Sequence, residues 1–349
     1  MAAEPRITGI GRANPPRRYT QREIYDLSRK FVPMYRNPRI EQIFMNSDIE
    51  YRHLSFDAET FVPDEPADVL HARFEEHAVV LGREAVLRCF EDAEILPGEV
   101  DFIVAVTCTG YLCPGLSAIL IKDLGLRTNL QRADLVGMGC AGAMPGLQRA
   151  YDYVMAYPGR KALVVTVEIC SACYYIDDSV ETVVGNAICA DGAAAVIVSS
   201  GGEGKGPRIL GFDTLLEPSF LHTVGFQTRE GKLRIVLSKD IRDAAGGLVR
   251  RLLDSLLAQN SLRREDVAHW IIHSGGRKVI DSIRDEIGVR EDQLRHSRCV
   301  LRNFGNMSSP TVLFVLDETM RESRPQTGDT GVMIAMGPGL AIEGAVLRW

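Results

Sequence analysis

Three side chains that can do chemistry together lie far apart in this sequence: Cys140, His273 and Asn306. Residues 132–136 have the pattern of the end of a buried strand, a glycine turn follows, and a helical pattern comes after Cys140. A cysteine at such a junction lies near helix N–H groups, whose partial positive charge favours a thiolate. Because a lone cysteine is more often plain core, the prediction of a nucleophile depends on the rest of the chain.

The chain contains a faint second copy of itself. Residues 101–110 (DFIVAVTCTG) and residues 267–276 (VAHWIIHSGG) are both apolar strands that run into glycine, and 267 − 101 gives an offset of 166. The same offset takes Cys140 to Asn306, where a short apolar run and a glycine turn again precede a helical pattern. Because one offset relates two different motifs, we predict two duplicated α/β units, with chance as the competing explanation.

The duplication would bring the three side chains to one site. We expect an N-terminal half, residues 1–200, that carries Cys140, and a C-terminal half, residues 201–349, that carries His273 and Asn306. Such a set can supply a nucleophile, a general base or donor, and an amide donor. Papain-like proteases use the same three residue types, but their cysteine lies in a CGSCW-like stretch near the mature N-terminus, which this chain lacks.

The composition limits the classes of protein. A chain of 349 residues with 46% hydrophobic content can bury a large core, and a net charge of −6 argues against a nucleic-acid-binding surface. The eight cysteines form no dense disulfide pattern, and the CxxC pair Cys170 and Cys173 lacks the second pair or histidine cluster of a zinc site. The N-terminus lacks an apolar signal core, and no apolar run reaches membrane-spanning length. We therefore expect a soluble, cytoplasmic protein without a bound metal.

Four stretches resemble the signatures of type III polyketide synthases, the chalcone synthase-like family: GMGCAGAMPGL, HSGGRKVID, FGNMSSPTVLFVLDE and MGPGLAIE. The match covers nearly the whole chain in the same order. Within the family, NSDIEYRHL, TGYLCPGLSAILIKDLGL and HWIIHSGGRKVID are most similar to the bacterial branch that makes 3,5-dihydroxyphenylacetyl-CoA. The resemblance implies a thiolase-like αβαβα sandwich that works as a homodimer, in agreement with the duplication.

The resemblance also implies a reaction. Cys140 would take an acyl group from a CoA thioester, and His273 would help to keep it a thiolate as an ion pair. His273 and Asn306 would hold the thioester oxygen of malonyl-CoA while carbon dioxide leaves, because donors aimed at that oxygen stabilise the enolate. The carbanion would then attack the acyl-cysteine and lengthen the chain by two carbons. The substrates would be malonyl-CoA, with or without another acyl-CoA as starter, and no metal or redox cofactor is needed.

The resemblance implies which residues shape the substrate cavity. Plant members place two phenylalanines at the junction of tunnel and cavity, and the matching positions here are Cys189 and Ile235. Phe226 falls where plant members have glycine, so it would fill part of the cavity. The full set expected around the cavity is Cys108, Cys173, Cys189, Phe226, Ile235, Gly337, Pro338 and Gly339. The alternative is that the cysteines and the apolar side chains among them are ordinary core.

Three basic residues lie where the family binds CoA. Arg39 and Arg52 fall in the segment that contacts the CoA phosphates, and Lys278 follows the glycine pair of the histidine motif, where pantetheine passes. A basic residue on a mixed-charge helix is often only a solvated face, and that alternative stays open for the two arginines.

Four functions are consistent with the sequence. The first makes a dihydroxyphenylacetyl-CoA-like aromatic from malonyl-CoA, and the second uses a fatty or aromatic starter to make pyrones or resorcinols. The third is an enzyme like ketoacyl-carrier-protein synthase III, and the fourth is an inactive thiolase-fold binding protein. The presence of Cys140, His273 and Asn306 together argues against the last.

Overall fold

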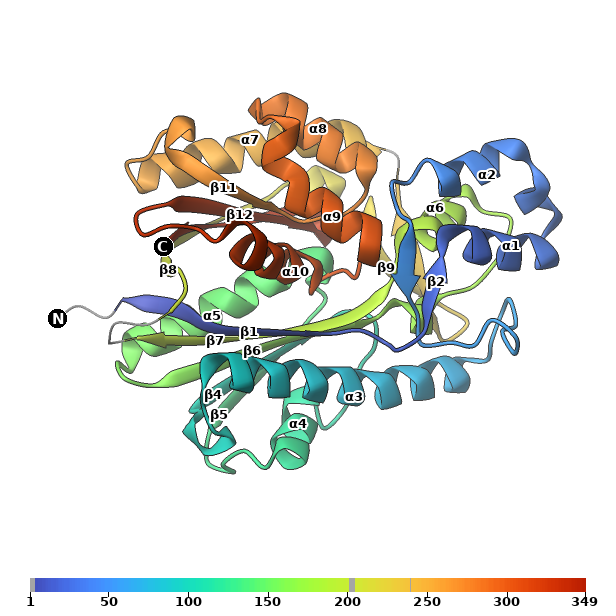
Figure 1. Ribbon diagram of the computed structural model, residues 1–349. Coiled ribbons are helices and arrows are strands. Elements are labelled where there is room, and N and C mark those ends of the chain that lie inside the picture. The colour runs from blue at the N-terminus through green and yellow to red at the C-terminus, as the bar shows by residue number, and fades with distance from the viewer. Residues whose placement is uncertain (1–3, 201–204, 239) are drawn as a thin grey trace.

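A nine-stranded sheet runs through the molecule as two strand layers, and helices lie below, between and above them (Figure 1). The computed structural model describes residues 4–200, 205–238 and 240–349. One strand layer contains β1 (Pro5–Ala13), β4 (Phe102–Thr107), β5 (Gln131–Val136), β6 (Lys161–Ile169) and β7 (Asp191–Ser200). The other contains β8 (Arg208–Leu216), β11 (Val267–Ile272), β12 (Thr330–Gly337) and β13 (Ala341–Arg348).

The strand order is β11-β12-β13-β8-β1-β7-β6-β4-β5. Among the described residues, one registered strand pair, Arg6 with Arg208, joins the two layers through β1 and β8. β4 pairs in parallel with β5 and β6, and β11 pairs in parallel with β12, whereas the β6–β7 and β12–β13 pairs are antiparallel. The two layers thus repeat one strand arrangement, as the offset in the sequence predicts.

Helices form the remaining three layers. The outer layer on the first half is α3 (Ala67–Ala93) with α4 (Leu116–Leu124), and the outer layer on the second half is α7 (Asp240–Gln259) with α8 (Arg277–Ile287). The middle layer is α5 (Ala143–Ala156) with α10 (Thr311–Glu318). The architecture is therefore the predicted αβαβα sandwich (Figure 1).

The alternating direction of side chains along each strand explains why helices cover both faces of the sheet. On β4, Val104 and Val106 are buried in the cluster that contains α5 and α10, whereas Ile103 and Ala105 are buried in the cluster that contains α3 and α4. Because successive side chains of a strand point to opposite faces, both faces of the strand need apolar residues. The run of six buried residues on β4 meets this requirement.

Two local expectations differ from the structure. β5 is an edge strand rather than a buried one, and Val136 at its end is 55% exposed. The short apolar run before Asn306 is a helix, α9 (Arg295–Phe304), and not a second copy of β5. Its buried residues His296, Ser297, Val300 and Leu301 recur at helical spacing, which explains why this segment departs from the repeat.

A cap of short elements covers one end of the sandwich. It contains α1 (Gln21–Phe31), α2 (Pro38–Met45), α6 (Val180–Ile188), β2 (Arg18–Thr20), β3 (Tyr51–His53) and the hairpin β9 (Val224–Arg229) with β10 (Lys232–Leu237). Much of its core is aromatic, with Tyr25, Tyr35, Phe44 and Tyr174 all buried. In the described ranges, no helix has both the length and the apolar run needed to cross a membrane.

Candidate active site

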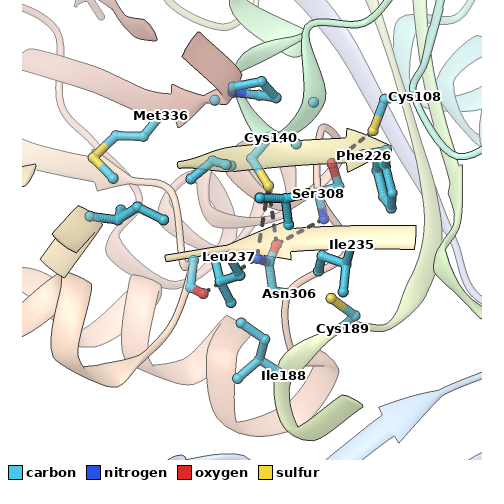
Figure 2. Close-up of a pocket in the computed structure, with 18 of the residues that line it drawn as sticks. Cys108, Cys140, Ile188, Cys189, Phe226, Ile235, Leu237, Asn306, Ser308 and Met336 are labelled. Carbon is cyan, nitrogen blue, oxygen red and sulfur yellow. Dashed lines mark hydrogen bonds between the residues drawn. The ribbon is translucent and has the colours of Figure 1, made fainter. Parts of the chain in front are cut away.

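The structure brings Cys140, His273 and Asn306 to one cavity of about 110 Å³. Figure 2 shows Cys140 and Asn306 side by side in it. Cys140 lies in a short 3-10 turn, Gly139–Ala141, between β5 and α5. His273 follows the last residue of β11, and Asn306 lies two residues beyond the end of α9. The duplicated architecture therefore places three residues from different loops around one space.

Glycines allow the turn that carries Cys140 to lie close to the cavity wall formed by Gly337 and Pro338. Gly139 has a φ of 50°, and a Cβ on it would lie 2.4 Å from Cδ of Pro338. A Cβ on Gly337 would lie 2.5 Å from the carbonyl oxygen of Met138. Gly337 and Pro338 line the cavity as expected, whereas Gly339 does not line it and makes the turn behind them with a φ of 98°. Any side chain at these glycines would push the turn and the wall apart.

The side-chain amide of Asn306 is oriented by its neighbours. Its Oδ1 accepts a hydrogen bond from the backbone N–H of Ser308 at 2.8 Å. Its Nδ2 donates to the carbonyl of Gly275 at 3.3 Å and lies 3.8 Å from Sγ of Cys140 (Figure 2). The backbone is fixed as well, because Asn306 N–H donates to the carbonyl of Ile188 at 2.8 Å. The amide is thus held beside the nucleophile, with both Nδ2 and Oδ1 at 3.8 Å from the sulfur.

His273 is a buried imidazole with free nitrogens. Its backbone N–H donates to the carbonyl of Ile334 at 2.8 Å, while Nδ1 and Nε2 have no hydrogen-bond partner among the described residues. Burial lowers the pKa of His273 to about 4, so the ring is neutral at pH 7. A neutral imidazole offers one donor and one acceptor to a bound substrate.

The expected ion pair between Cys140 and His273 is not formed in this structure. Burial raises the pKa of Cys140 to about 12, against the smaller opposing effect of hydrogen bonds from Ser308 and Asn306. Both groups are therefore neutral, because separating two charges in a small apolar cavity costs more than their attraction returns. In the substrate-free cavity burial thus opposes the predicted resting thiolate at Cys140.

A first prediction concerns His273 and the pH dependence of folding. The unfolded histidine has a pKa of 6.5 and the folded one about 4, so between these values the unfolded chain binds more protons and stability falls as the pH falls. From pH 7.5 to pH 5 this group should cost about 2 kcal/mol of unfolding free energy, measured by urea titration. His273→Gln should lose that part of the dependence, and His222→Gln, at an exposed site, should retain it. Equal pH dependence in all three proteins would contradict a buried neutral imidazole.

Most of the predicted cavity residues line the site. Cys108, Cys189, Phe226 and Ile235 all face it, and Phe226 pairs directly with Ile235 across the β9–β10 hairpin. Cys173 is an exception, because its side chain is buried and donates to the carbonyl of Thr109 at 3.5 Å. In its place Cys170 lines the cavity, since the segment Cys170–Cys173 is a 3-10 turn that directs the two cysteines differently.

A wider cavity of about 720 Å³ forms the approach to the site. Five residues line both cavities: Ile188, Leu237, Ile241, Gly275 and Val279. Arg39 and Lys278 line the wider cavity, as the CoA prediction requires. Arg277 also lines it and was not predicted. The three cations suit a ligand with phosphate groups.

The CoA prediction is wrong for Arg52. Its side chain is 0% exposed and lines neither cavity. The guanidinium Nη1 donates to the carbonyls of Asn186 at 2.6 Å and Cys189 at 2.8 Å. A side chain on β3 that is buried in this way cannot reach a phosphate at the entrance.

Two residues of the site were missed from the sequence. Ser308 lines the cavity, and its hydroxyl lies 3.5 Å from Sγ of Cys108. Glu168 is fully buried and accepts hydrogen bonds from the backbone N–H of Cys108 at 3.0 Å and the hydroxyl of Ser309 at 2.6 Å. Burial raises the pKa of Glu168. It is the single charged residue in the apolar run ALVVTVEI, and that was an available signal.

The potential metal ligands in the described part of the chain do not cluster. No group of three or more His, Cys, Asp or Glu side chains there is arranged to hold a metal ion. All eight cysteines are free thiols, including the CxxC pair Cys170 and Cys173.

Comparison with known proteins agrees with this geometry. The family profile "FAE1/Type III polyketide synthase-like protein" matches residues 40–210, and "Chalcone and stilbene synthases, C-terminal domain" matches residues 214–349. The 3,5-dihydroxyphenylacetyl-CoA synthase of Amycolatopsis balhimycina is 35% identical over 99% of this chain and 93% of its own length.

Solved structures of type III polyketide synthases are also similar to this chain. PKS-I of the brown alga Ectocarpus siliculosus superposes with a TM-score of 0.94 at 31% identity, covering 100% of this chain and 99% of that one. The 1,3,6,8-tetrahydroxynaphthalene synthase of Streptomyces coelicolor gives a TM-score of 0.92 at 26% identity, covering 99% of each chain. With its fold, its cavity and its sequence in agreement, this chain belongs to the type III polyketide synthases, a family of transferases that condense acyl-CoA thioesters.

Proposed function

We propose that this protein condenses malonyl-CoA on Cys140 into a short polyketide that closes to a 3,5-dihydroxyphenylacetyl-CoA-like aromatic. The observation that carries the proposal is a small cavity with Cys140, His273 and Asn306 at its wall, joined to a wider approach lined by Arg39 and Lys278. Relatives named 3,5-dihydroxyphenylacetyl-CoA synthase, 33% to 35% identical over 99% of this chain, support the product.

Loading begins when a CoA thioester reaches the cavity through the wider approach. The thiol of Cys140 attacks the thioester carbonyl, and the neutral imidazole of His273 can accept the thiol proton as the new bond forms. The bond between the acyl carbon and the CoA sulfur breaks, the CoA sulfur takes the proton from His273, and CoA leaves as its thiol while the imidazole becomes neutral again. The acyl group is then a thioester of Cys140.

Extension uses a second malonyl-CoA. Loss of carbon dioxide leaves the electron pair on the thioester as an enolate, and donors from Asn306 Nδ2 and the His273 N–H stabilise its oxygen. The carbanion attacks the acyl-Cys140 carbonyl, Cys140 leaves as a thiolate, and the chain on CoA is two carbons longer. Repetition of the loading step returns this chain to Cys140 for the next extension. Every step uses only residues of this chain and CoA thioesters, so we propose no metal or redox cofactor.

The shape of the cavity favours a short product. Phe226 and Ile235 face each other across the hairpin at its wall and leave a space of about 110 Å³. A ligand binds well when the pocket encloses most of its surface. A cavity of this size can enclose a short flexible chain but not a long fatty starter. We therefore propose that malonyl-CoA serves as both starter and extender. Four malonyl units, the starter included, each lose carbon dioxide and supply the four two-carbon units of an eight-carbon dihydroxyphenylacetyl group.

We also propose a homodimer in the cytoplasm. β5 is the last strand of the sheet and leaves one edge open, with Val136 more than half exposed. Open strand edges are usually covered, and a second copy of the chain is the simplest cover. Free cysteines fit a reducing compartment. A solution mass of one chain, measured by light scattering, would contradict the dimer.

The test of the product is incubation of the purified protein with malonyl-CoA alone, followed by mass spectrometry. We expect dihydroxyphenylacetyl-CoA or its hydrolysed acid. Product that forms only after a fatty or aromatic acyl-CoA is added would favour the pyrone or resorcinol function instead. Condensation that requires malonyl on a carrier protein would favour a ketoacyl-carrier-protein synthase, and no condensation at all would indicate an inactive binding protein.

A second prediction concerns selectivity. Phe226→Gly should enlarge the cavity, and products should become longer or bulkier starters should be accepted, while Cys189→Phe should narrow the cavity and lower turnover. Both effects depend on volume, and relaxation of the surrounding core can reduce them. Gln227→Gly, at the exposed neighbour on the same strand, is the matched control and should leave the products unchanged. Unchanged product length and starter range in a folded Phe226→Gly dimer would show that Phe226 does not limit the chain.

A further inference from the structure

Arg52 is among the largest side chains that the structure buries completely. Its guanidinium Nη1 donates to the carbonyls of Asn186 at 2.6 Å and Cys189 at 2.8 Å. In the described part of the chain, Nε and Nη2 have no hydrogen-bond partner, so these two carbonyls are the contacts that hold the guanidinium. Because burying a cation costs free energy, the contacts that retain it need an explanation.

Both carbonyls lie at the C-terminal end of α6, where Cys189 is the C-cap residue. The last carbonyls of a helix have no partner within the helix and carry its partial negative charge, so a cation beside them is favourable. The carbonyl of Ala187, between the two, accepts a hydrogen bond from Nε2 of Gln21 at 2.7 Å. The end of α6 is thus held by two buried side chains, Arg52 and Gln21.

Asn306 is hydrogen-bonded to the same end of α6. Its backbone N–H donates to the carbonyl of Ile188 at 2.8 Å, and its own carbonyl accepts from the N–H of Ala190 at 2.9 Å. These contacts lie on either side of Cys189, which forms a β-bridge with Asn306. Ile188, Cys189 and Asn306 lie together at the wall of the cavity (Figure 2). The backbone of Asn306 therefore takes its position from the helix end that Arg52 holds.

The stem of Arg52 also packs against the residue that precedes Asn306. A Cβ on Gly305 would lie 3.0 Å from both Cγ and Cδ of Arg52 and 2.9 Å from the carbonyl oxygen of Ile188. Gly305 has a φ of 70°, so this turn needs glycine for its backbone as well as for the close approach. Arg52 thus contacts both the turn before Asn306 and the helix end beside it.

Ser308 and Arg52 set different properties of the same donor. The hydrogen bond from the Ser308 N–H to Oδ1 at 2.8 Å fixes the rotation of the Asn306 amide within its own loop. The contacts of Arg52 fix instead where that loop lies relative to Cys140 and His273, which come from other elements. A donor stabilises an oxyanion well only when it is held within about 0.5 Å of the productive geometry.

We propose that Arg52 is a positioning residue for the decarboxylation step: it holds the C-terminal end of α6, and through it the backbone of Asn306, so that Nδ2 reaches the enolate oxygen. The proposal rests on the donor role proposed above for Asn306. Without the guanidinium, the carbonyls of Asn186 and Cys189 would be buried without donors, which is costly. We expect the end of α6 and the loop after α9 to shift together in response.

The test is Arg52→Met, which keeps an apolar stem beside Gly305 and removes the donors. Cys140 is first loaded from acetyl-CoA, which has no carboxylate to lose, and carbon dioxide release from malonyl-CoA is then measured. Decarboxylation should fall by about 10–100-fold and loading by less than about threefold, because the displaced donor serves the enolate. Equal losses in the two rates are the result that a merely structural role of Arg52 would give.

Arg52→Lys and Arg127→Met are the comparison variants. Both carbonyls accept from one nitrogen of Arg52, so a lysine ammonium has the donors to replace it, and decarboxylation should return to within about threefold of the unaltered rate. Arg127 also donates to a backbone carbonyl, that of Val100 at 3.0 Å, but it lines neither cavity. Its replacement by methionine should leave both rates unchanged.

A double-mutant cycle shows whether Arg52 acts through Asn306. In the Asn306→Ala protein, Arg52→Met should lower decarboxylation by less than about twofold further, because the group that it positions is gone. If Arg52→Met does not fold, Arg52→Gln takes its place in the same cycle with the same expectation. Additive losses in the double variant, equal losses in loading and decarboxylation, or no loss at all would overturn the proposal.

The cycle also separates this proposal from the proposed function, since neither rate requires the product to be identified. A normal loss in Asn306→Ala with no loss in the Arg52 variant would overturn only the role of Arg52. An unaltered decarboxylation rate in Asn306→Ala would contradict the donor role of Asn306 and the role of Arg52 together.

Discussion

Cys140→Ala should lower product formation by on the order of 10⁴-fold or more, because removal of a covalent nucleophile removes the step that carries the chain. The position of Cys140 in the turn between β5 and α5, with Asn306 Nδ2 at 3.8 Å from its sulfur, is the reason for the size of the effect. The measurement is the rate of product release from malonyl-CoA, together with the mass of the intact protein. Slow decarboxylation of malonyl-CoA can persist, since His273 and Asn306 remain.

The matched control is Cys113→Ala. Cys113 is an exposed free thiol outside the cavity, so its loss should leave the rate within experimental error of the unaltered protein. Full product formation by Cys140→Ala, or equal losses in the two variants, would remove Cys140 from the nucleophile role.

Asn306→Ala should lower the rate by about 10²–10³-fold, the usual cost of one donor to a developing oxyanion. Decarboxylation of malonyl-CoA should suffer more than loading of Cys140, because the enolate oxygen is the charge that Nδ2 would stabilise. The hydrogen bond from Ser308 to Oδ1 at 2.8 Å fixes the amide before substrate arrives, so little reorganisation is needed. Single-turnover loading and carbon dioxide release, measured separately, give the two rates.

Asn303→Ala provides the comparison for Asn306. Asn303 lies on α9, where its side chain donates to the carbonyl of Cys299 at 2.9 Å and does not line the cavity. Its removal should affect both rates little. Small and equal effects of Asn306→Ala on loading and decarboxylation would show that Asn306 only supports the loop after α9.

The repeat in the sequence predicted two related α/β halves and the meeting of the three site residues, whereas the five layers were implied by the resemblance to the type III polyketide synthases. Gly139 with Cys140 and Gly305 with Asn306 occupy related turns, and the offset between them is a property of the chain that needs no tertiary information. The offset could not show that α9 replaces the strand before Asn306. That choice depends on which face of the segment is buried against β11 and α10.

Burial explains the remaining differences between the predictions from the sequence and the structure. Arg52 has the same sequence context as a solvent-facing basic residue, and only the packing of β3 against Gly305 and Asn186 removes it from the surface. The 3-10 turn decides that Cys170 rather than Cys173 reaches the cavity. The neutral state of Cys140 likewise follows from the loss of water around it, which no spacing of residues reports.

The most direct test of the central claim is the identity of the cysteine that carries the growing chain. The protein is mixed briefly with malonyl-CoA alone, quenched in acid and digested, and the cysteine peptides are weighed. We expect a series of adducts on the peptide that contains Cys140, spaced by C2H2O units, and none on the peptides of Cys108 or Cys170. A chain carried on another cysteine, or adducts that appear only when a different acyl-CoA starter is supplied, would contradict condensation of malonyl units on Cys140.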